Sequence, residues 1–356
     1  MTNDQNAVPE SSLTPKVDAL PEGSLHLTAS PHLRHSETVT KIMVWVVIAL
    51  VPSLIASYIF FGVRTLLLTA ASVIAAVVTE WVAARIMQRP SSIGDFSAVV
   101  TGILVAFNVP SELPLWMVAL GSVFAIGVGK MVFGGLGANF INPALAGRAF
   151  LMASYPSAMT MFGPTTSGSL SGISIDGLSS ATPLAQFKMA MANGTFQALD
   201  FQEALKELFF GNVGGCIGET SALALLIGGV ILIYRRIIGI RIPLIYIGTV
   251  FTLSWLFNGT GAHFTSGAII VPVYQILAGG LFLGAFFMAT DMVTTPITPK
   301  GKIIFALGCG LLTFVIRKFG GYPEGVSYSI LIMNLFVPII ERYTRPRIYG
   351  EVKKRD

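Results

Sequence analysis

The chain has 356 residues, of which 53% are hydrophobic and only 12% are charged. Soluble domains carry about 25% charged residues, so this composition excludes an ordinary soluble protein and predicts an integral membrane protein. The net charge of +5 does not indicate a nucleic-acid partner, because no basic stripe with interleaved aromatic residues occurs. Basic residues in a membrane protein report its topology instead.

Residues 1–40 are polar and lack the apolar core that a signal peptide needs. Pro9, Pro15, Pro21 and Pro31 lie among these polar residues. The stretch predicts a mobile N-terminal tail that stays in the cytoplasm.

Ten apolar runs follow, and each is a candidate transmembrane helix, because about 20 apolar residues cross a bilayer. The runs are 42–61, 65–85, 96–109, 113–132, 140–159, 213–234, 237–257, 267–290, 303–316 and 326–340. Runs 96–109 and 303–316 are short for a hydrocarbon core of about 30 Å, which leaves re-entrant segments and a total of nine spans open. The expected fold is an all-α integral membrane protein with about ten transmembrane helices.

Basic residues predict the orientation, because cytoplasmic loops are enriched in Lys and Arg. With an even number of spans, one side holds Arg34, Lys41, Arg85, Arg89, Lys130, Arg235, Arg236, Arg241, Lys300, Lys302, Arg342, Arg345, Arg347, Lys353, Lys354 and Arg355. The other side holds only Arg64, Lys188, Lys206, Arg317 and Lys318. The bias predicts that both termini are cytoplasmic and that the long polar loop, residues 160–212, faces outward.

A weak internal repeat suggests two inverted halves of five helices each, residues 41–159 and 213–341, followed by a cytoplasmic tail, 342–356. Residues 133–147 and 319–333 both begin with FGG, follow a helix with a basic end and lead into the fifth helix of a group. Inverted repeats are common in transporters. Chance similarity between glycine-rich segments is the alternative. Gly279 and Gly280, with Gly284, have a spacing that suits helix packing alone.

Four charged residues in or near the apolar runs are candidates for function, because a charge at the bilayer centre costs about 2.5–3.5 kcal/mol on insertion scales. Glu80, Glu219 and Asp291 are candidates for an ion path. Alternatively, Glu80 reaches the cytoplasmic interface and the other two acids cap helices. Arg148 either binds a flavin phosphate or carbonyl, or pairs with a neighbouring acid or backbone carbonyl.

Metal and nucleotide motifs give no further candidates. Cys216 and Cys309 lie far apart in apolar segments, and the four histidines are scattered, so no metal site made by this chain alone is expected. The sequence has no Walker loop and no GxGxxG after a strand.

The polar loop contains the stretch DGLSSATPL, residues 176–184. Ser179, Ser180 and Ala181 are small, which predicts that the hydroxyl of Thr182 is accessible to a modifying enzyme. The following proline disfavours helical geometry at Thr182. Asp176 is suited to bind a metal ion or to orient the segment. Ordinary loop chemistry explains the same composition.

The chain resembles the family of D-type subunits of Rnf (Rsx) electron-transport complexes, and more distantly the NqrB subunit of the sodium-translocating NADH:quinone reductase. The resemblance runs from about residue 30 to residue 350. It is carried by SPH (30–32), GGLGANFINPA (134–144), DGLSSATPL (176–184), LGAFFMATDMVT (283–294), FGGYPEGVSYSIL (319–331) and YTRPRIYG (343–350). The last two blocks point to the D-type subunit.

This resemblance implies that Thr182 carries FMN through a phosphoester bond, which a separate flavin transferase installs from FAD on the outer side of the membrane. Asp176, Ser179, Ser180 and Ala181 then form the flavinylation motif. Ser180 departs from the glycine or glutamine that the family often has, but it is also small. The resemblance further implies a second, non-covalent flavin, either riboflavin or FMN.

The implied function is that of a membrane subunit in a complex that couples electron transfer between ferredoxin and NAD to Na⁺ or H⁺ translocation. Iron–sulfur, NADH-binding and second flavin-bearing subunits are the expected partners, together with the flavin transferase and the bilayer. Two alternatives remain. One is a quinone-reductase subunit of the NqrB type, and the other is a channel or secondary transporter without a redox role.

Overall fold

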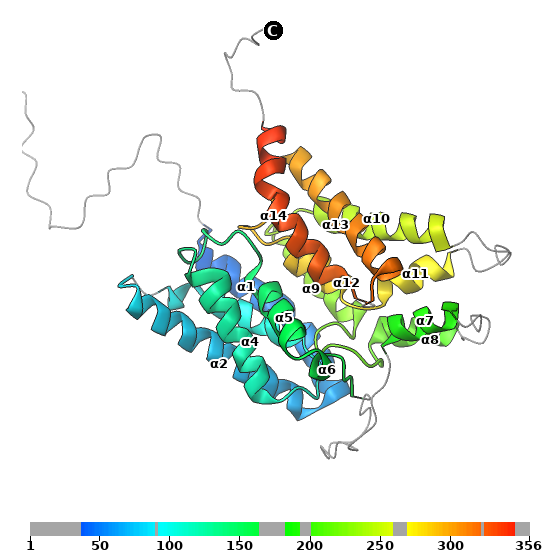
Figure 1. Cartoon of the computed structure of the whole chain (residues 1–356), viewed down its shortest axis with the longest axis horizontal. Coiled ribbons are helices and arrows are strands. Elements are labelled where there is room, and N and C mark those ends of the chain that lie inside the picture. The colour runs from blue at the N-terminus through cyan, green and yellow to red at the C-terminus, as the bar shows by residue number, and fades with distance from the viewer. Residues whose placement is uncertain are drawn as a thin grey trace, which may run out of the picture. The chain divides into compact units, whose positions relative to one another are not determined.

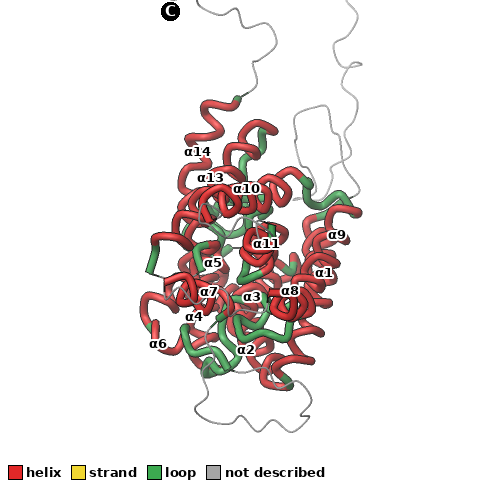
Figure 2. Tube along the Cα trace, turned by 90° about the vertical axis from the view of Figure 1, so that its right-hand side faces the viewer, coloured by secondary structure: helices red, strands yellow, loops and turns green. Residues whose placement is uncertain are grey.

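The computed structural model describes residues 37–89, 92–163, 182–192, 201–258, 269–321 and 324–345. All helices in these ranges belong to one unit of the chain, Val39–Asp356. Figure 2 shows helices joined by loops, and the described residues contain no strand. The all-α prediction is confirmed for this part of the chain.

Each of the ten apolar runs overlaps helical structure. The first group comprises α1 (Val39–Phe61), α2 (Val63–Ile86), the 3-10 turn η2 (Ile93–Asp95), α3 (Ser97–Phe107), α4 (Leu115–Ile126), the π-helix η3 (Gly127–Met131), α5 (Pro143–Ser154) and α6 (Pro156–Met159). The second comprises α9 (Ala222–Tyr234), α10 (Arg241–Asn258), α11 (Ile270–Leu277), α12 (Leu281–Leu283), the π-helix η5 (Gly284–Met288), α13 (Pro299–Phe319) and α14 (Val326–Thr344). Between the groups lie α7 (Pro183–Ala192) and α8 (Phe201–Phe210).

The two groups repeat the same packing pattern. In the first group α2 packs against α3 and α4, and α4 packs against α5; in the second, α10 packs against α11 and α13, and α13 packs against α14. Figure 1 shows the first group in blue to green and the second in yellow-green to red. The two groups meet where α1 packs on α9 and α5 packs on α14.

Among the helices of the described residues, two are long and apolar enough to cross a membrane by themselves. These are α1 and α2, with mean hydropathy 2.4 and 2.0 over 18-residue windows. Residues 270–277 and 281–288 pass the same test together, but they are bent by 66° at the break between them. Four apolar helical segments are shorter: α3, α4 with η3, α9 and α10. The run 96–109, which corresponds to α3, was expected to be short. The run 303–316 was also expected to be short, but it lies within α13, which has 21 residues because polar and basic residues extend the helix at both ends.

The first two helices turn their apolar side chains outward. Ile55, Leu67 and Ile74 are more than half exposed. The buried side chains include small polar residues: Ser53, Ser57, Thr65, Thr69 and Ser72. In lipid, apolar side chains gain nothing by turning inward, whereas small polar residues let helices approach closely and form hydrogen bonds. This distribution is that of a membrane protein.

Three predicted helices differ from the structure. The run 140–159 is helical only from Pro143 and is interrupted at Tyr155, where α5 ends before α6. The run 213–234 is helical only from Ala222, and 267–290 is interrupted between Leu277 and Leu281. Hydropathy does not detect these departures, because almost all of the non-helical residues are themselves apolar or small; Glu219 is the exception. Irregular backbone at membrane depth is tolerated where protein buries it.

Candidate functional site

Thr182 directly precedes α7, of which Pro183 is the first residue. The Thr182 hydroxyl accepts a hydrogen bond from the Ala185 N–H at 3.3 Å, which is an N-cap contact. Proline suits the first position of a helix, because an N–H there would have no helical partner. Thr182 therefore lies at the positively polarised end of α7.

The helix α7 is docked on α11. The Tyr274 hydroxyl donates to the Pro183 carbonyl oxygen at 2.9 Å, and the rings of Phe187 and Tyr274 stack with centroids 5.4 Å apart. Leu184, Phe187, Tyr274 and Leu208 from α8 belong to one buried apolar cluster. Figure 1 shows α7 and α8 beside α11.

Docking changes the environment of Thr182. The residue is only 4% exposed, so the prediction of an accessible hydroxyl is wrong for this arrangement. That prediction was based on the small size of the residues that precede Thr182 in the sequence. Burial follows instead from tertiary packing, because α7 folds onto α8 and α11.

The break between α11 and α12 contacts α7, because Leu184 of α7 packs against Gly279 in the break. Gly279 has φ +72°, a conformation that favours glycine, and a Cβ there would meet the end of the Leu184 side chain, Cδ1, at 2.7 Å. The sequence suggested that helix packing alone explains Gly279, but the structure shows that its backbone conformation is also a reason for glycine. Arg317 from α13 donates to the carbonyl oxygens of Gln275 and Ala278, the latter at 3.1 Å. A cation is thus buried at the C-terminal end of α11, where it is favourable.

The turn before α9 is fixed by hydrogen bonds to its backbone. The Ile217 and Gly218 N–H groups donate to Val109 and Phe107 carbonyls, each at 3.0 Å. Ser57 donates to the Ile217 carbonyl at 2.5 Å, and Ser53 to that of Gly218 at 3.1 Å. These contacts satisfy the buried backbone of the turn and hold Cys216 and Glu219 in the interior.

Arg148 from α5 joins this turn to the start of α14. Its Nη1 donates to Glu219 Oε1 at 2.8 Å and to Asn108 Oδ1 at 2.7 Å. Its Nη2 donates to Glu324 Oε2 and lies 3.8 Å from Cys216 Sγ. The Arg148 and Glu219 side chains are 6% and 4% exposed, and that of Glu324 is 14% exposed. We call Arg148, Glu219 and Glu324 the open cluster.

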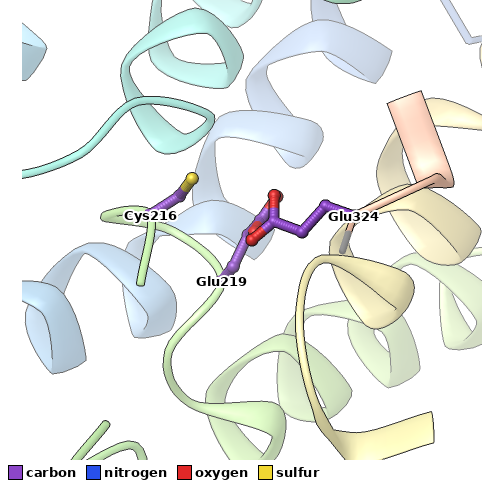
Figure 3. A group of neighbouring side chains, drawn as sticks. All are labelled: Cys216, Glu219 and Glu324. Atoms are coloured by element: carbon purple, nitrogen blue, oxygen red, sulfur yellow. The ribbon is translucent and has the colours of Figure 1, made fainter. Parts of the chain in front are cut away.

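Figure 3 shows the carboxylates of Glu219 and Glu324 pointing toward one another, with the Cys216 thiol nearby. One ligand-type atom from each of the three residues lies within 4.8 Å of the others. Sequence spacing gave no sign of this group, since its members come from distant segments. Among its oxygens, Glu219 Oε2 is buried and has no hydrogen-bond partner.

Glu80 lies in a different buried group. Lys130 from η3 donates to Glu80 Oε2 at 2.8 Å and to Ser97 Oγ at 2.6 Å, and Ser92 donates to Glu80 Oε1. The side chains of Glu80 and Lys130 are 0% and 2% exposed. The carboxylate therefore pairs inside the protein and does not reach an interface. We call Glu80 and Lys130 the closed pair.

Asp291 follows η5 and lines a cavity with Asn139, Phe286 and Phe287. Its Oδ2 accepts from Thr294 Oγ1 at 2.9 Å, so it stabilises the turn that leaves the helix. Asn139 Oδ1, also buried, has no hydrogen-bond partner.

The structure brings together two of the sequence candidates, Arg148 and Glu219, and leaves Glu80 and Asp291 elsewhere. The sequence analysis missed Glu324, Lys130 and Arg317 as site residues. Each is a charged residue within or next to an apolar run, and this feature could have identified them. Asp176, Ser179, Ser180 and Ala181 lie outside the described residues.

Comparison with known proteins agrees with the resemblance in the motifs. The model of the NQR2, RnfD, RnfE family matches residues 26–350. The D-type subunit of the Na⁺-translocating ferredoxin:NAD⁺ oxidoreductase complex of Acetobacterium woodii is 47% identical over 334 residues, which cover 93% of this chain and 97% of that protein. Its counterpart in the proton-translocating complex of Clostridium ljungdahlii is 46% identical over 325 residues, covering 91% and 96%.

A third relative is the D-type subunit of the ion-translocating oxidoreductase complex of Stutzerimonas stutzeri. It is 39% identical over 331 residues, which cover 88% of this chain and 92% of that protein. With a family match over most of its length and relatives at this level of identity, the chain belongs to the NQR2, RnfD, RnfE family.

Proposed function

We propose that this chain is the D-type membrane subunit of an Rnf complex, in which electron transfer between ferredoxin and NAD is coupled to translocation of Na⁺ or H⁺. In this role it relays electrons through FMN attached to Thr182. The observation that carries the proposal is the position of Thr182, at the N-terminus of a helix docked on a broken membrane helix. The names of the relatives, which include both a Na⁺- and a proton-translocating complex, support the same function.

The residues at Thr182 fit a phosphoester. A phosphate on this hydroxyl would lie at the first turn of α7, where the Ala185 N–H already donates to the hydroxyl oxygen and the helix dipole favours an anion. The helix has ten residues. When bound, FMN supplies one- or two-electron transfer, while the protein supplies its position and electrostatic environment.

Loading requires that the docked segment first release Thr182. The hydroxyl oxygen displaces AMP from FAD, loses its proton and forms the phosphoester. A transferase needs access to that oxygen, which is buried when α7 lies on α11. We therefore propose that loading precedes docking, or occurs while the hydrogen bond between Tyr274 and Pro183 is open.

The second, non-covalent flavin has a candidate position in the cavity lined by Asn139, Phe286, Phe287 and Asp291. Ligand sites combine apolar walls with a few polar groups, and the unpartnered Asn139 Oδ1 supplies an acceptor. Asn139→Leu is expected to reduce the flavin that denaturation releases, without removing covalent flavin. Unchanged released flavin would exclude this cavity.

Contacts between loops support the predicted topology of ten spans in two inverted halves. On the predicted outer side, Arg64 contacts Glu112 and Lys188 donates to the Gly320 carbonyl. On the predicted cytoplasmic side, the Ile297 N–H donates to Glu341. Each contact joins two segments assigned to the same side. We propose that the protein lies in the bacterial inner membrane with both termini cytoplasmic and Thr182 on the outer side.

Other subunits must supply the remaining reactions. We propose that iron–sulfur, NADH-binding and second flavin-bearing subunits are partners of this chain, and that a separate flavin transferase modifies it. Of the three acids proposed for an ion path, Glu219 is the best suited to bind an ion, because one of its carboxylate oxygens is buried without a hydrogen-bond partner. Glu80 is paired with Lys130, and Asp291 stabilises a turn.

Flavin fluorescence of the protein in a denaturing gel tests the covalent assignment. We expect a fluorescent band from cells that contain the transferase, no band for Thr182→Ala, and a retained band for Thr182→Ser, which keeps a hydroxyl. Fluorescence in Thr182→Ala would place the flavin elsewhere.

A secondary transporter without a redox role is the second candidate, and the bend of 66° between α11 and α12 favours it, since discontinuous helices surround the sites of many transporters. A chain without flavin fluorescence that still transports Na⁺ would support a transporter.

A role as a subunit of a quinone reductase is tested by purification. An Rnf subunit is expected to copurify with a ferredoxin-reactive iron–sulfur protein.

A further inference from the structure

The charges of the open cluster do not balance. Arg148 donates to one oxygen of Glu219 and to one of Glu324. With both carboxylates ionised, the three side chains carry one net negative charge. Burying a charge is costly unless it is paired and hydrogen-bonded, so this excess indicates a cation that belongs to the site.

One oxygen is free to accept that cation. Glu219 Oε2 is buried and has no hydrogen-bond partner among the described residues. Buried polar atoms are nearly always satisfied, and an exception needs a specific explanation, such as an ion. The Glu219 side chain is 4% exposed and its carboxylate faces that of Glu324 (Figure 3).

The other groups that face these carboxylates do not remove the excess. Asn108 is neutral. The Cys216 thiol lies within hydrogen-bonding range of Glu219, but it is a weak donor and brings no positive charge. Arg317 from α13 lies within electrostatic range of both glutamates. Its Nη1 and Nη2 nevertheless donate to the carbonyls at the end of α11, where its charge offsets the helix dipole.

A divalent metal does not fit this geometry. Arg148 already occupies an oxygen of each carboxylate, so a divalent ion would lie beside a guanidinium with only one net negative charge to offset it. A single positive charge on the remaining oxygens restores neutrality. The break between α11 and α12 is adjacent, because a Cβ on Gly280 would clash with Glu219 Oε1, and Gly280 is the residue directly before α12.

We propose that the Glu219–Glu324 pair binds one exchangeable monovalent cation, Na⁺ or a proton, and that the break in α11–α12 links its occupancy to the docked flavin segment. The link is a continuous set of contacts. Leu184 packs against Gly279, Tyr274 holds Pro183, and Gly280 lies against Glu219. The linkage rests on the proposed function, whereas the cation site does not depend on the flavin.

The linkage is tested in the purified complex by the midpoint potential of the flavin on Thr182. Coupling between two sites is reciprocal, so a cation at the cluster shifts that potential. If Na⁺ is the ligand, the potential shifts with Na⁺ but not with K⁺ at fixed pH. If a proton is the ligand, the potential acquires an additional pH dependence and is insensitive to Na⁺.

Glu219→Gln is expected to abolish this shift, and Glu324→Gln to reduce it. Glu112→Gln is the matched control, because Glu112 pairs with Arg64 at an exposed site, with side chains 37% and 43% exposed; it should keep the full shift. An undiminished shift in Glu219→Gln would overturn the linkage. Retained gel fluorescence in each variant separates this result from a failure to attach FMN.

Carbodiimide labelling of the unsubstituted complex tests the cation site without any variant. Dicyclohexylcarbodiimide is apolar and modifies protonated buried carboxyl groups. We expect peptides containing Glu219 or Glu324 to be labelled more at lower pH. If Na⁺ but not K⁺ reduces the labelling, Na⁺ is the ligand. If the extent of labelling is the same with and without Na⁺, the ligand is a proton. Absence of label at both residues under all conditions would overturn the proposal.

Discussion

Two buried groups of charged side chains, the closed pair and the open cluster, differ in how their charges are satisfied. In the closed pair, the Lys130 ammonium contacts Glu80 and Ser97, and both Glu80 oxygens have donors. In the open cluster, one guanidinium serves two carboxylates and Glu219 Oε2 has no partner. Both groups are similarly buried, so burial alone does not identify the functional one.

The difference indicates two roles. A pair with balanced charges, in which both carboxylate oxygens have donors, has no position left for another cation, and it connects α2 to η3 as a structural contact. A cluster with one excess negative charge and a free oxygen retains the capacity to bind a cation. The open cluster also lies at the break in α11–α12, next to the segment that carries Thr182, whereas the closed pair contacts neither.

Removing one partner of the closed pair should give the largest loss of stability. Lys130→Met leaves the Glu80 carboxylate buried without its cation, and breaking a buried pair in this way costs about 3–5 kcal/mol. Thermal unfolding of the purified complex in detergent measures the loss. Glu80→Gln combined with Lys130→Met removes both charges and should recover most of it. An unchanged unfolding temperature in Lys130→Met would contradict a structural role for the pair.

Gly218→Ala should disturb the turn before α9, which holds Glu219 of the open cluster in place. A Cβ there clashes with the Phe107 side chain, and overpacking costs about 1–3 kcal/mol. Because Glu219 is the next residue, ion-coupled transport should fall together with stability. Gly215→Ala is the matched control, since no atom lies within 4 Å of its added Cβ. Equal effects of the two substitutions would show that the turn is not closely packed.

Loosening the docked segment should have a smaller effect on stability. Tyr274→Phe removes the hydrogen bond to the Pro183 carbonyl, which contributes about 0.5–1.5 kcal/mol. We expect faster attachment of FMN, measured as the growth of gel fluorescence after the transferase is induced. Slower attachment would show that the docked arrangement is the one the transferase recognises.

The exposed ion pair between Arg64 and Glu112 should contribute least to the stability of the protein. Arg64→Gln breaks its contact with Glu112, and exposed pairs contribute about 0–1 kcal/mol. The unfolding temperature should change little, and high salt should reduce even that change. A loss as large as that of Lys130→Met would mean that burial does not distinguish the two pairs.

Each apolar run predicted from the sequence overlaps helical structure, because long apolar runs are a strong local signal. It failed where the backbone departs from helix inside such a run. Residues 213–221 and 278–280 are apolar or small enough to pass as helix, and their conformations depend on distant partners such as Phe107, Arg317 and Leu184. Counting basic loop residues also included Lys130 and Arg317, which are buried, but the bias remains without them.

The site was predicted only in part. Thr182 was singled out by its motif, whereas its burial by α11 has no local signature. For Arg148, pairing with an acid was one of two alternatives, and the structure supports it. The partners lie 71 and 176 residues away, so the three-membered cluster, with its unequal charges, becomes visible only in three dimensions.

Peptide mass spectrometry of the protein, isolated from membranes of cells with an active flavin transferase, is the sharpest test of the proposed flavin attachment. We expect the peptide containing Thr182 to carry the added mass of FMN, less one water, and fragmentation to assign it to the Thr182 side chain. An unmodified Thr182 peptide in that preparation would contradict the proposed function.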